Sequence, residues 1–370
     1  MSKAKSNPVR ESGVELLRIF MMLQVIYLHV CVFGGFSNIG MNSGGKFGMF
    51  FWIVMMLSRC PIYVYMIITG YFSVNSKLSW ARPSDIGRKA WKIWAPMIFY
   101  SVLLYLVCVP TGLVSVSAME TVRVFVPALS GTWYFMTLYL IIIALMPFLN
   151  KLLVDLKKRD YLILLGIMVF LFCIWKPVAK IGFFDEIIDI KQIFVTSGGK
   201  SLYDMLFMYA LGGYLRRYSK SFDKPRCIYL VIFVVLGVIN GLVSFYWKDY
   251  STVAMYNDNP ISVIQCICLF LFFRDIKFKS AFVNKISGYT FAVYLIHMDP
   301  IFRQVIWGKI FPFTAKAELY TNYWFPFVIM GVILAIFAGC CIADELRQQI
   351  FKGVGVVFGK IRLKNKTDDV

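Results

Sequence analysis

The chain carries little charge for its size and almost no histidine. Of its 370 residues, 16% are charged, 59% are hydrophobic and only two are histidine. A soluble globular domain has about a quarter of its residues charged and about half apolar. The composition therefore excludes an ordinary soluble domain and indicates a protein that lies largely within a lipid bilayer.

Motifs of several enzyme classes are also missing. There is no CxxC pair and no cluster of cysteine and histidine, and most of the nine cysteines lie in apolar runs as inert packed thiols, so we expect no metal. The absence of GxSxG and HExxH argues against a soluble-type hydrolase and a zinc protease. Gly199-Lys200-Ser201 resembles the end of a phosphate loop, but Phe194 stands where that loop needs its first glycine. We expect no permanently bound cofactor.

Long apolar stretches dominate the rest of the chain. A membrane-spanning helix needs about 20 mostly apolar residues, and ten stretches qualify. They are roughly 14–35, 48–72, 92–111, 132–149, 160–175, 201–215, 227–246, 259–273, 288–306 and 323–343. The pattern predicts an all-α polytopic transmembrane helical bundle of about 10 spans. The sixth stretch is short and contains Gly212 and Gly213, which predicts either a tightly packed short span or a partly re-entrant element.

The formal charge is +19, and the distribution of the Lys and Arg residues along the chain indicates how the protein is oriented in the membrane. Lys and Arg form short clusters between the apolar runs and not one stripe, so nucleic acid is not an expected partner. Most of them fall on one side if the N-terminus is inside, which predicts that both termini are cytoplasmic.

The first apolar run is too long for a signal peptide and is expected to be retained. No repeat divides the chain, so we predict one transmembrane domain over 1–345 and a basic cytoplasmic tail over 346–370. The longest outside segment, about 176–200, is placed to cover an extracellular mouth.

Ionisable residues inside spans are the first candidates for function, because each costs about 2.5 to 3.5 kcal/mol to insert. In the first span Arg18 and His29 are eleven residues apart, which at about 100° per residue puts them on one helix face, about 16 Å apart along the axis. Glu15 lies one turn before Arg18 and can pair with it. A cation near the cytoplasm and a base deeper in the membrane suit a phosphate-bearing donor and a proton transfer. The alternatives are an arginine that reaches to the interface and a histidine that only packs.

Other polar positions in the spans have less specific interpretations. Arg59 precedes Pro61, and a proline break there could line a polar cavity, although a structural role for Arg59 is as plausible. His297 and Asp299 are two residues apart, so they do not face each other on a helix and form no dyad. Trp133-Tyr134 and Tyr323-Trp324 are more typical of interface belts than of stacking platforms.

The run from Glu15-Leu16-Leu17-Arg18 to Leu28-His29 resembles the Arg, ten residues, His signature of the acyltransferase 3 family of integral membrane acyltransferases. The resemblance is strongest to the exopolysaccharide and cell-wall O-acetyltransferase branch and spans nearly the whole chain. Further similar segments, in the same order, are Ser58-Arg59-Cys60-Pro61 with Thr69-Gly70-Tyr71, Arg88-Lys89-Ala90-Trp91-Lys92 with Pro96, Thr132-Trp133-Tyr134-Phe135 with Pro147-Phe148-Leu149-Asn150, 209–217, and 291–297 with Tyr294 and His297.

The resemblance implies a membrane enzyme that uses acetyl-CoA as acyl donor and delivers the acetyl group to an acceptor on the outer face. It also implies that the first-span arginine and histidine, here Arg18 and His29, are needed. The chain departs from the family pattern at Cys60, at Thr69, and in having no histidine before Trp133. These departures do not touch the Arg18 and His29 pair, although the choice of acceptor can differ.

We therefore predict an O-acetyltransferase of the plasma membrane that acts on a sugar hydroxyl of a surface or exported polysaccharide or its lipid-linked precursor. His29 is the predicted base or acetyl carrier. Arg18, with Arg88 and Lys89, is predicted to hold acetyl-CoA. The predicted supporting residues are Glu15, Arg59, Trp133, Tyr294 and His297. The main alternative is a transporter or flippase of lipid-linked sugars, and a membrane sensor or scaffold is a third.

Overall fold

The computed structural model describes residues 11–175 and 198–367, and within these ranges every regular element is helical. The elements, in chain order, are α1 (Ser12–Val32), α2 (Phe36–Asn42), α3 (Gly45–Leu57), α4 (Pro61–Ser73), α5 (Pro83–Cys108), α6 (Ala118–Phe125), α7 (Tyr134–Asp155), α8 (Lys158–Met168), η1 (Val169–Trp175), α11 (Leu202–Arg217), η2 (Ser219–Phe222), α12 (Arg226–Tyr246), α13 (Lys248–Ala254), α14 (Pro260–Arg274), α15 (Ala281–Met298), α16 (Pro300–Val305), η3 (Ile306–Ile310), η4 (Pro312–Ala315), η5 (Ala317–Thr321) and α17 (Phe325–Thr367). The predicted all-helical class is confirmed. Most of the predicted outer segment 176–200 lies outside the described residues.

Each of the ten predicted apolar stretches is helical, although several are not one helix. The second is divided into α3 and α4, the fifth passes from α8 into the π-helical η1, and the ninth covers parts of α15 and α16. Within the described ranges, six helical segments are long and apolar enough to cross a membrane: Ser12–Val32, Gly45–Ser73, Pro83–Cys108, Tyr134–Asp155, Arg226–Tyr246 and Phe325–Phe351. A multi-pass membrane protein is therefore confirmed, and the count of ten spans stays a prediction.

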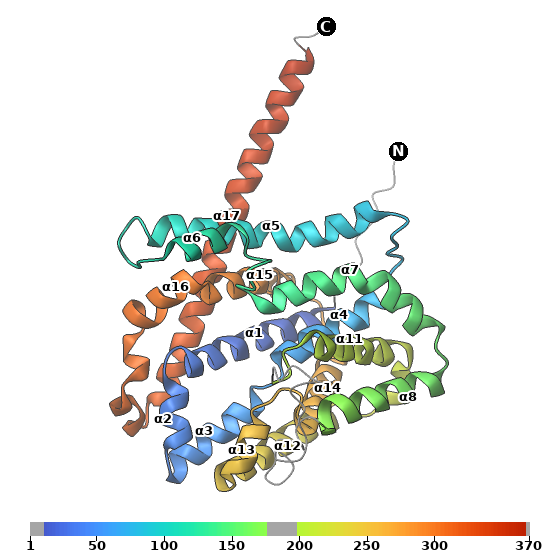
Figure 1. The fold of residues 1–370 in the computed structure, drawn as a ribbon, viewed down its shortest axis with the longest axis vertical. Helices are drawn as coiled ribbons and strands as arrows, with labels where there is room; N and C mark the ends of the chain where they lie inside the picture. The colour runs from blue at the N-terminus through green and yellow to red at the C-terminus, as the bar shows by residue number, and fades with distance from the viewer. Residues whose placement is uncertain (1–10, 176–197, 368–370) are drawn as a thin grey trace.

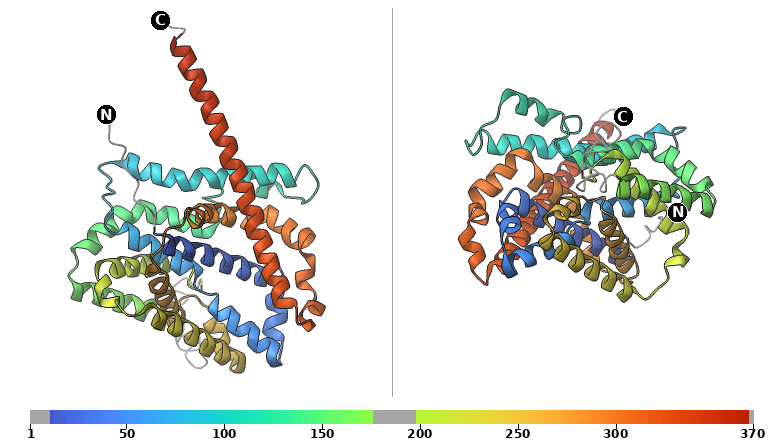
Figure 2. Two further views of the ribbon diagram at one scale, coloured as in Figure 1. Left: turned by 180° about the vertical axis from the view of Figure 1, so that it is seen from behind. Right: turned by 60° about the horizontal axis from the view of Figure 1, so that its bottom comes forward.

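The helices pack around α1, which contacts α4, α14, α15 and α17. Figure 1 shows α1, α4, α7, α11 and α15 running in roughly the same direction across the molecule, while α17 crosses them and projects well beyond the bundle. The views in Figure 2 show the same arrangement, with α5 and α6 on one outer side. α1 therefore lies within the bundle, between α4, α14, α15 and α17.

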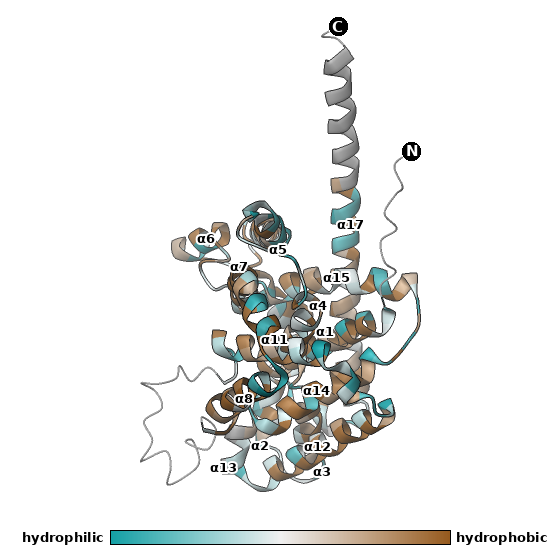
Figure 3. Cartoon of the chain, turned by 90° about the vertical axis from the view of Figure 1, so that its right-hand side faces the viewer, coloured by the Kyte–Doolittle hydropathy of each residue, from teal (hydrophilic) through white to brown (hydrophobic). Residues whose placement is uncertain are grey.

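The outer helices present apolar side chains outward. Phe148 on α7, Val231 on α12 and Leu334 on α17 are 63%, 58% and 49% exposed, and Figure 3 shows apolar residues along much of α8 and α12. Soluble proteins rarely expose apolar patches on this scale. A surface of this kind is stable against hydrocarbon, in which the helical backbone satisfies its own hydrogen bonds.

Two glycines allow α11 to lie directly on α4. A Cβ atom on Gly70 would be 2.0 Å from the carbonyl oxygen of Tyr209, and one on Gly212 would be 2.2 Å from that of Ile67. Such small residues let membrane helices approach backbone to backbone. The structure contains a tightly packed helix over 201–215, and its topology in the membrane, a short span or a partly re-entrant element, stays a prediction.

The break between α3 and α4 confirms the one predicted from Pro61. Leu57 ends α3, and Pro61 begins α4 in the first turn, where its missing N–H is not needed. The Leu57 carbonyl, freed by the break, accepts a hydrogen bond from Nε2 of Gln24 on α1 at 3.0 Å. The break therefore places Arg59 in a short non-helical segment that is anchored to α1.

Candidate functional site

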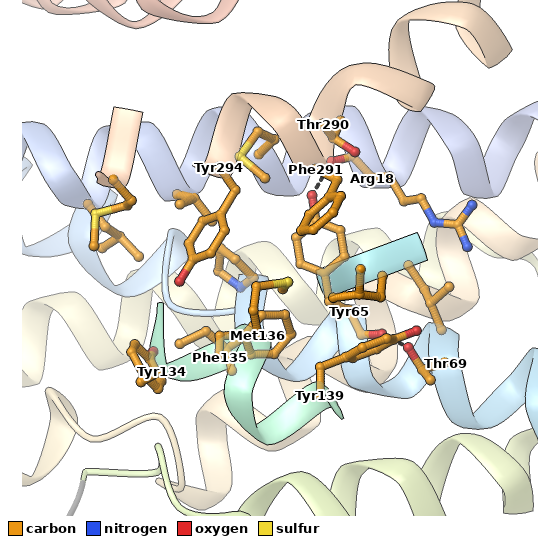
Figure 4. Close-up of a pocket in the computed structure, with 18 of the residues that line it drawn as sticks. Arg18, Tyr65, Thr69, Tyr134, Phe135, Met136, Tyr139, Thr290, Phe291 and Tyr294 are labelled. Carbon is orange, nitrogen blue, oxygen red and sulfur yellow. Dashed lines mark hydrogen bonds between the residues drawn. The ribbon is translucent and has the colours of Figure 1, made fainter. Parts of the chain in front are cut away.

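A largely apolar cavity of about 260 Å³ lies between α1, α4, α7 and α15. Both Arg18 and His29 line it, so the two residues predicted to share a face also share one cavity. The polar or aromatic lining residues include Arg18, His29, Tyr65, Thr69, Tyr134, Phe135, Tyr139, Thr290, Phe291 and Tyr294. Figure 4 shows Arg18 at one end of the cavity, with Tyr134 and Tyr294 toward the other.

Arg18 is held in place by a predicted partner and a further residue. Its guanidinium lies 2.6 Å from Oε1 of Glu15, and Oε2 of Glu15 accepts a hydrogen bond from the Ser287 hydroxyl of α15 at 2.5 Å. The Glu15 side chain is almost fully buried, whereas the Arg18 side chain is 30% exposed. The buried carboxylate therefore fixes the guanidinium at the cavity and leaves part of it accessible to a ligand.

His29 contacts the other histidine of the chain. Nδ1 of His29 lies 2.9 Å from Nε2 of His297 on α15. Nδ1 of His297 is hydrogen bonded to the Val293 carbonyl, which can only accept, so in the neutral ring this nitrogen carries the proton. Nε2 of His297 then accepts from the Nδ1–H of His29. This leaves Nε2 of His29 with a lone pair beside the cavity.

Asp299 does not take part in this pair, as the sequence spacing predicted. Its Oδ1 accepts hydrogen bonds from the backbone N–H groups of Ile301 and Phe302, both at 3.0 Å. It therefore caps the N-terminus of α16, which begins directly after it. The partner of His297 is instead His29 of α1.

Two tyrosine hydroxyls lie near the histidine end of the cavity. Tyr134 and Tyr294 both line it, and neither hydroxyl makes a hydrogen bond within the described residues. The Tyr294 ring centroid lies 6.3 Å from that of His297. By contrast, the Tyr65 hydroxyl donates to the Arg18 carbonyl at 2.8 Å. The first two hydroxyls are therefore available to a bound molecule, whereas Tyr65 supports the backbone of α1.

Neither Trp133 nor Arg59 is among the residues that line the cavity, although Tyr134, which follows Trp133, is. The Trp133 side chain is fully buried, so its interpretation as part of an interface belt is wrong. Tyr323 and Trp324, at 96% and 68% exposed, fit a belt. Arg59 acts electrostatically on Tyr134, and its Nε is buried without a hydrogen-bond partner in the described part of the chain.

Arg88 and Lys89, the predicted helpers of Arg18, are not among the cavity residues. Arg88 is exposed and pairs with Asp85 at 2.5 Å. Lys89 donates from Nζ to the Ser73 hydroxyl at 3.5 Å. Ile93 does line the cavity, and it lies one turn after Lys89 on α5, so Lys89 shares the face of α5 that turns toward the cavity.

Sequence reasoning missed Tyr65, Thr69, Tyr139 and Thr290, which line the cavity. The available signal was the presence of polar side chains inside apolar spans, but single hydroxyls are too common there to be selected. The phosphate-loop interpretation of Ser201 was correctly set aside, because its side chain caps α11 together with Asp204. Within residues 11–175 and 198–367, no group of three or more metal-binding side chains occurs.

The fold and cavity define a multi-pass membrane protein with a histidine and an arginine in one buried site. Comparison with protein families matches the acyltransferase domain of the acyltransferase 3 family to residues 11–344. The chain belongs to this family of membrane acyltransferases. A search of curated proteins and a search of solved structures gave no significant match.

Proposed function

We propose that the protein transfers an acetyl group from cytoplasmic acetyl-CoA to a sugar hydroxyl of a surface or exported polysaccharide, or of its lipid-linked precursor. The observation that carries this proposal is the His29–His297 contact of 2.9 Å in a cavity that also contains Arg18. Family membership supports acyl transfer. The choice of acetyl-CoA as donor and of a sugar hydroxyl as acceptor is more specific than family membership, and we propose it from the residues of the site.

The spacing of Arg18 and His29 suits CoA as the donor. They lie about 16 Å apart along the helix, and the extended pantetheine arm separates the CoA phosphates from the thioester by a comparable length. Arg18 would bind phosphate or pantetheine groups through charge-assisted hydrogen bonds. If both termini are cytoplasmic, the Arg18 end of the cavity faces the cytoplasm and the His29 end lies in the outer half of the membrane.

His29 is placed to act as the general base. Its Nε2 takes the proton of the sugar hydroxyl while the hydroxyl oxygen attacks the thioester carbonyl carbon. The carbon–sulfur bond then breaks, and the departing CoA thiolate takes the proton back from Nε2. An acetyl-His29 intermediate is the alternative route, in which Nε2 itself attacks the thioester first.

The apolar lining of the cavity protects the thioester. Met22, Val25 and Ile68 are among the side chains that surround it. Excluding bulk water limits hydrolysis of acetyl-CoA and strengthens the electrostatic contacts inside the site. The proposal therefore assigns the helical bundle a chemical role besides crossing the plasma membrane.

The test is transfer of radiolabelled acetyl groups from acetyl-CoA into surface polysaccharide, in membranes with wild type or Arg18→Ala at matched levels. We expect label with wild type and a KM for acetyl-CoA raised about 10-fold or more in the variant. A protein that leaves no ester on the polysaccharide, but whose loss stops polysaccharide export, would be a transporter instead.

A further inference from the structure

A second cleft, of about 350 Å³, lies where α4 and α7 end. None of its lining residues lines the cavity that contains Arg18 and His29, and the transfer chemistry described above does not use it. Its walls are partly apolar and partly polar, and are made by Val74, Leu78, Pro147 and Val154 and by Asn75, Ser76, Asn150, Lys151 and Asp155. The distribution of basic residues predicts that this end of the bundle faces the cytoplasm.

Asn150 of α7 holds the cleft in shape. Its Nδ2 donates to the Ser73 carbonyl at 2.8 Å and to the Ser76 hydroxyl at 3.0 Å. Its Oδ1 accepts from the Tyr209 hydroxyl of α11 at 2.6 Å. Because Asn150 is only 5% exposed, a buried amide joins the end of α4 to α7 and α11. A cleft with a wall fixed in this way needs little reorganisation to bind a ligand.

Helix α4 leads from the Arg18 end of the cavity to this cleft. Figure 4 shows Thr69 of α4 toward the Arg18 end. Ser73 lies one turn after Thr69, and Val74, the next residue, lines the cleft. Val74 is therefore about 8 Å beyond Thr69 along the helix. The cleft follows the cavity along α4, on the side of Arg18 that is away from His29.

Lys89 of α5 lies between the cavity and the cleft. Its Nζ donates to the Ser73 hydroxyl at 3.5 Å and lies 3.2 Å from Sδ of Met146. Ile93, one turn later on α5, lines the cavity. In the part of the chain that the structure describes, no carboxylate pairs with Lys89. A half-buried ammonium that contacts a hydroxyl and a thioether is suited to bind an anion.

The proposed donor needs a binding region beyond Arg18. If the pantetheine arm of CoA runs from His29 to Arg18, its diphosphate lies near Arg18, and the adenosine 3′-phosphate extends further in the same direction. The second cleft lies there. It offers apolar walls to the base, amide and hydroxyl groups to its polar edge, and the cation of Lys151 to a phosphate.

We propose that this second cleft binds the adenosine 3′-phosphate of the CoA donor, with Lys151 at the 3′-phosphate and Lys89 at the diphosphate. Asp155, the carboxylate of the cleft, is suited to accept hydrogen bonds from the ribose hydroxyl or the amino group of the base. The inference rests on the proposed transfer function. It adds a separate binding site for the half of the donor that takes no part in the chemistry.

The experiment compares three donors with the full-length protein in membranes. They are acetyl-CoA, acetyl-dephospho-CoA, which lacks the 3′-phosphate, and S-acetylpantetheine, which lacks the nucleotide and the diphosphate. For each donor kcat and KM are measured with wild type, Lys151→Gln and Lys89→Gln. Lys157→Gln is the matched control, because Lys157 is an exposed lysine shortly after Lys151 that does not line the cleft.

We expect wild type to have its lowest KM with acetyl-CoA. Lys151→Gln should raise that KM about 10-fold and leave the KM for acetyl-dephospho-CoA unchanged, because only the 3′-phosphate loses its partner. Lys89→Gln should raise the KM for both nucleotide donors about 10-fold and leave that for S-acetylpantetheine unchanged. Lys157→Gln should match wild type with every donor.

Two kinds of result would overturn the proposal while acetyl transfer stands. One is equal KM values for the three donors in wild type. The other is a KM that the Lys89 and Lys151 variants leave unchanged, or change equally with every donor, as a lipid headgroup bound in the cleft would cause. Absence of transfer from all three donors would instead contradict the transfer function itself, and this proposal with it.

Discussion

The position of one proton, on Nδ1 of His29, determines whether the site can act as a base. His297 fixes that proton, because its own Nδ1 is committed to the Val293 carbonyl and its Nε2 can only accept. The arrangement is chemically comparable to the hydrogen bond by which a carboxylate orients a catalytic histidine. His297 is thus a positioning residue, since it acts through His29.

Replacing His297 should affect the rate and not the binding of the donor. We expect His297→Ala to lower kcat about 100-fold with little change in the KM for acetyl-CoA, because the Nε2 lone pair of His29 is no longer fixed. His297→Gln should recover part of the rate, since its amide oxygen can accept from Nδ1–H of His29. The measurement is steady-state kinetics at several pH values. A wild-type kcat and pH profile in His297→Ala would contradict this role.

Arg18 and His29 could be predicted from the sequence because ionisable groups within a span are rare and the two lie on one helix face. The His29–His297 contact could not be predicted, because the residues are 268 positions apart and meet only through the packing of α1 on α15. Trp133 was misjudged for a related reason. An indole at the start of a span suits an interface, and only tertiary packing shows that it is buried.

At the scale of helices, the close contact of α4 and α11 supports one wall of the site, because α4 also contributes Tyr65 and Thr69 to the cavity. Gly212→Ala should destabilise the protein by about 1–3 kcal/mol, because the added Cβ would meet the Ile67 carbonyl oxygen. Gly166→Ala on α8 is the matched control, since a Cβ there meets no atom within 4 Å. Thermal unfolding in detergent measures both, and a Gly212→Ala protein as stable as the control would refute the packing argument.

Helix positions were predictable because apolar stretches of the required length are long and regular, and Pro61 signalled the division of α3 from α4. The length of α17 could not be predicted in this way. Its apolar stretch ends near residue 343, whereas the helix continues to Thr367. Apolar residues indicate which part of a helix lies in lipid. The helix itself continues beyond that part as long as each further residue can add a backbone hydrogen bond. Charged residues after 343 therefore changed the environment of the helix without ending it.

For the whole molecule, the account depends on which way the bundle faces. Basic residues predict cytoplasmic termini, which would put Arg18 on the donor side and His29 nearer the acceptor. A reporter enzyme that is active only outside the cell, fused after Val370, should therefore be inactive, and a fluorescent protein that folds only in the cytoplasm should be bright. The opposite pair of results would reverse the proposed path of the acetyl group.

The central claim is that His29 takes part directly in the transfer of the acetyl group, either as the general base or as the acetyl carrier. The most direct test is the initial rate of acetyl transfer from labelled acetyl-CoA in liposomes that contain purified wild type or His29→Ala, with matched thermal stability. The account predicts a loss of at least about 100-fold with donor binding retained, because the base or acetyl carrier is absent. Transfer at the wild-type rate by His29→Ala would contradict it.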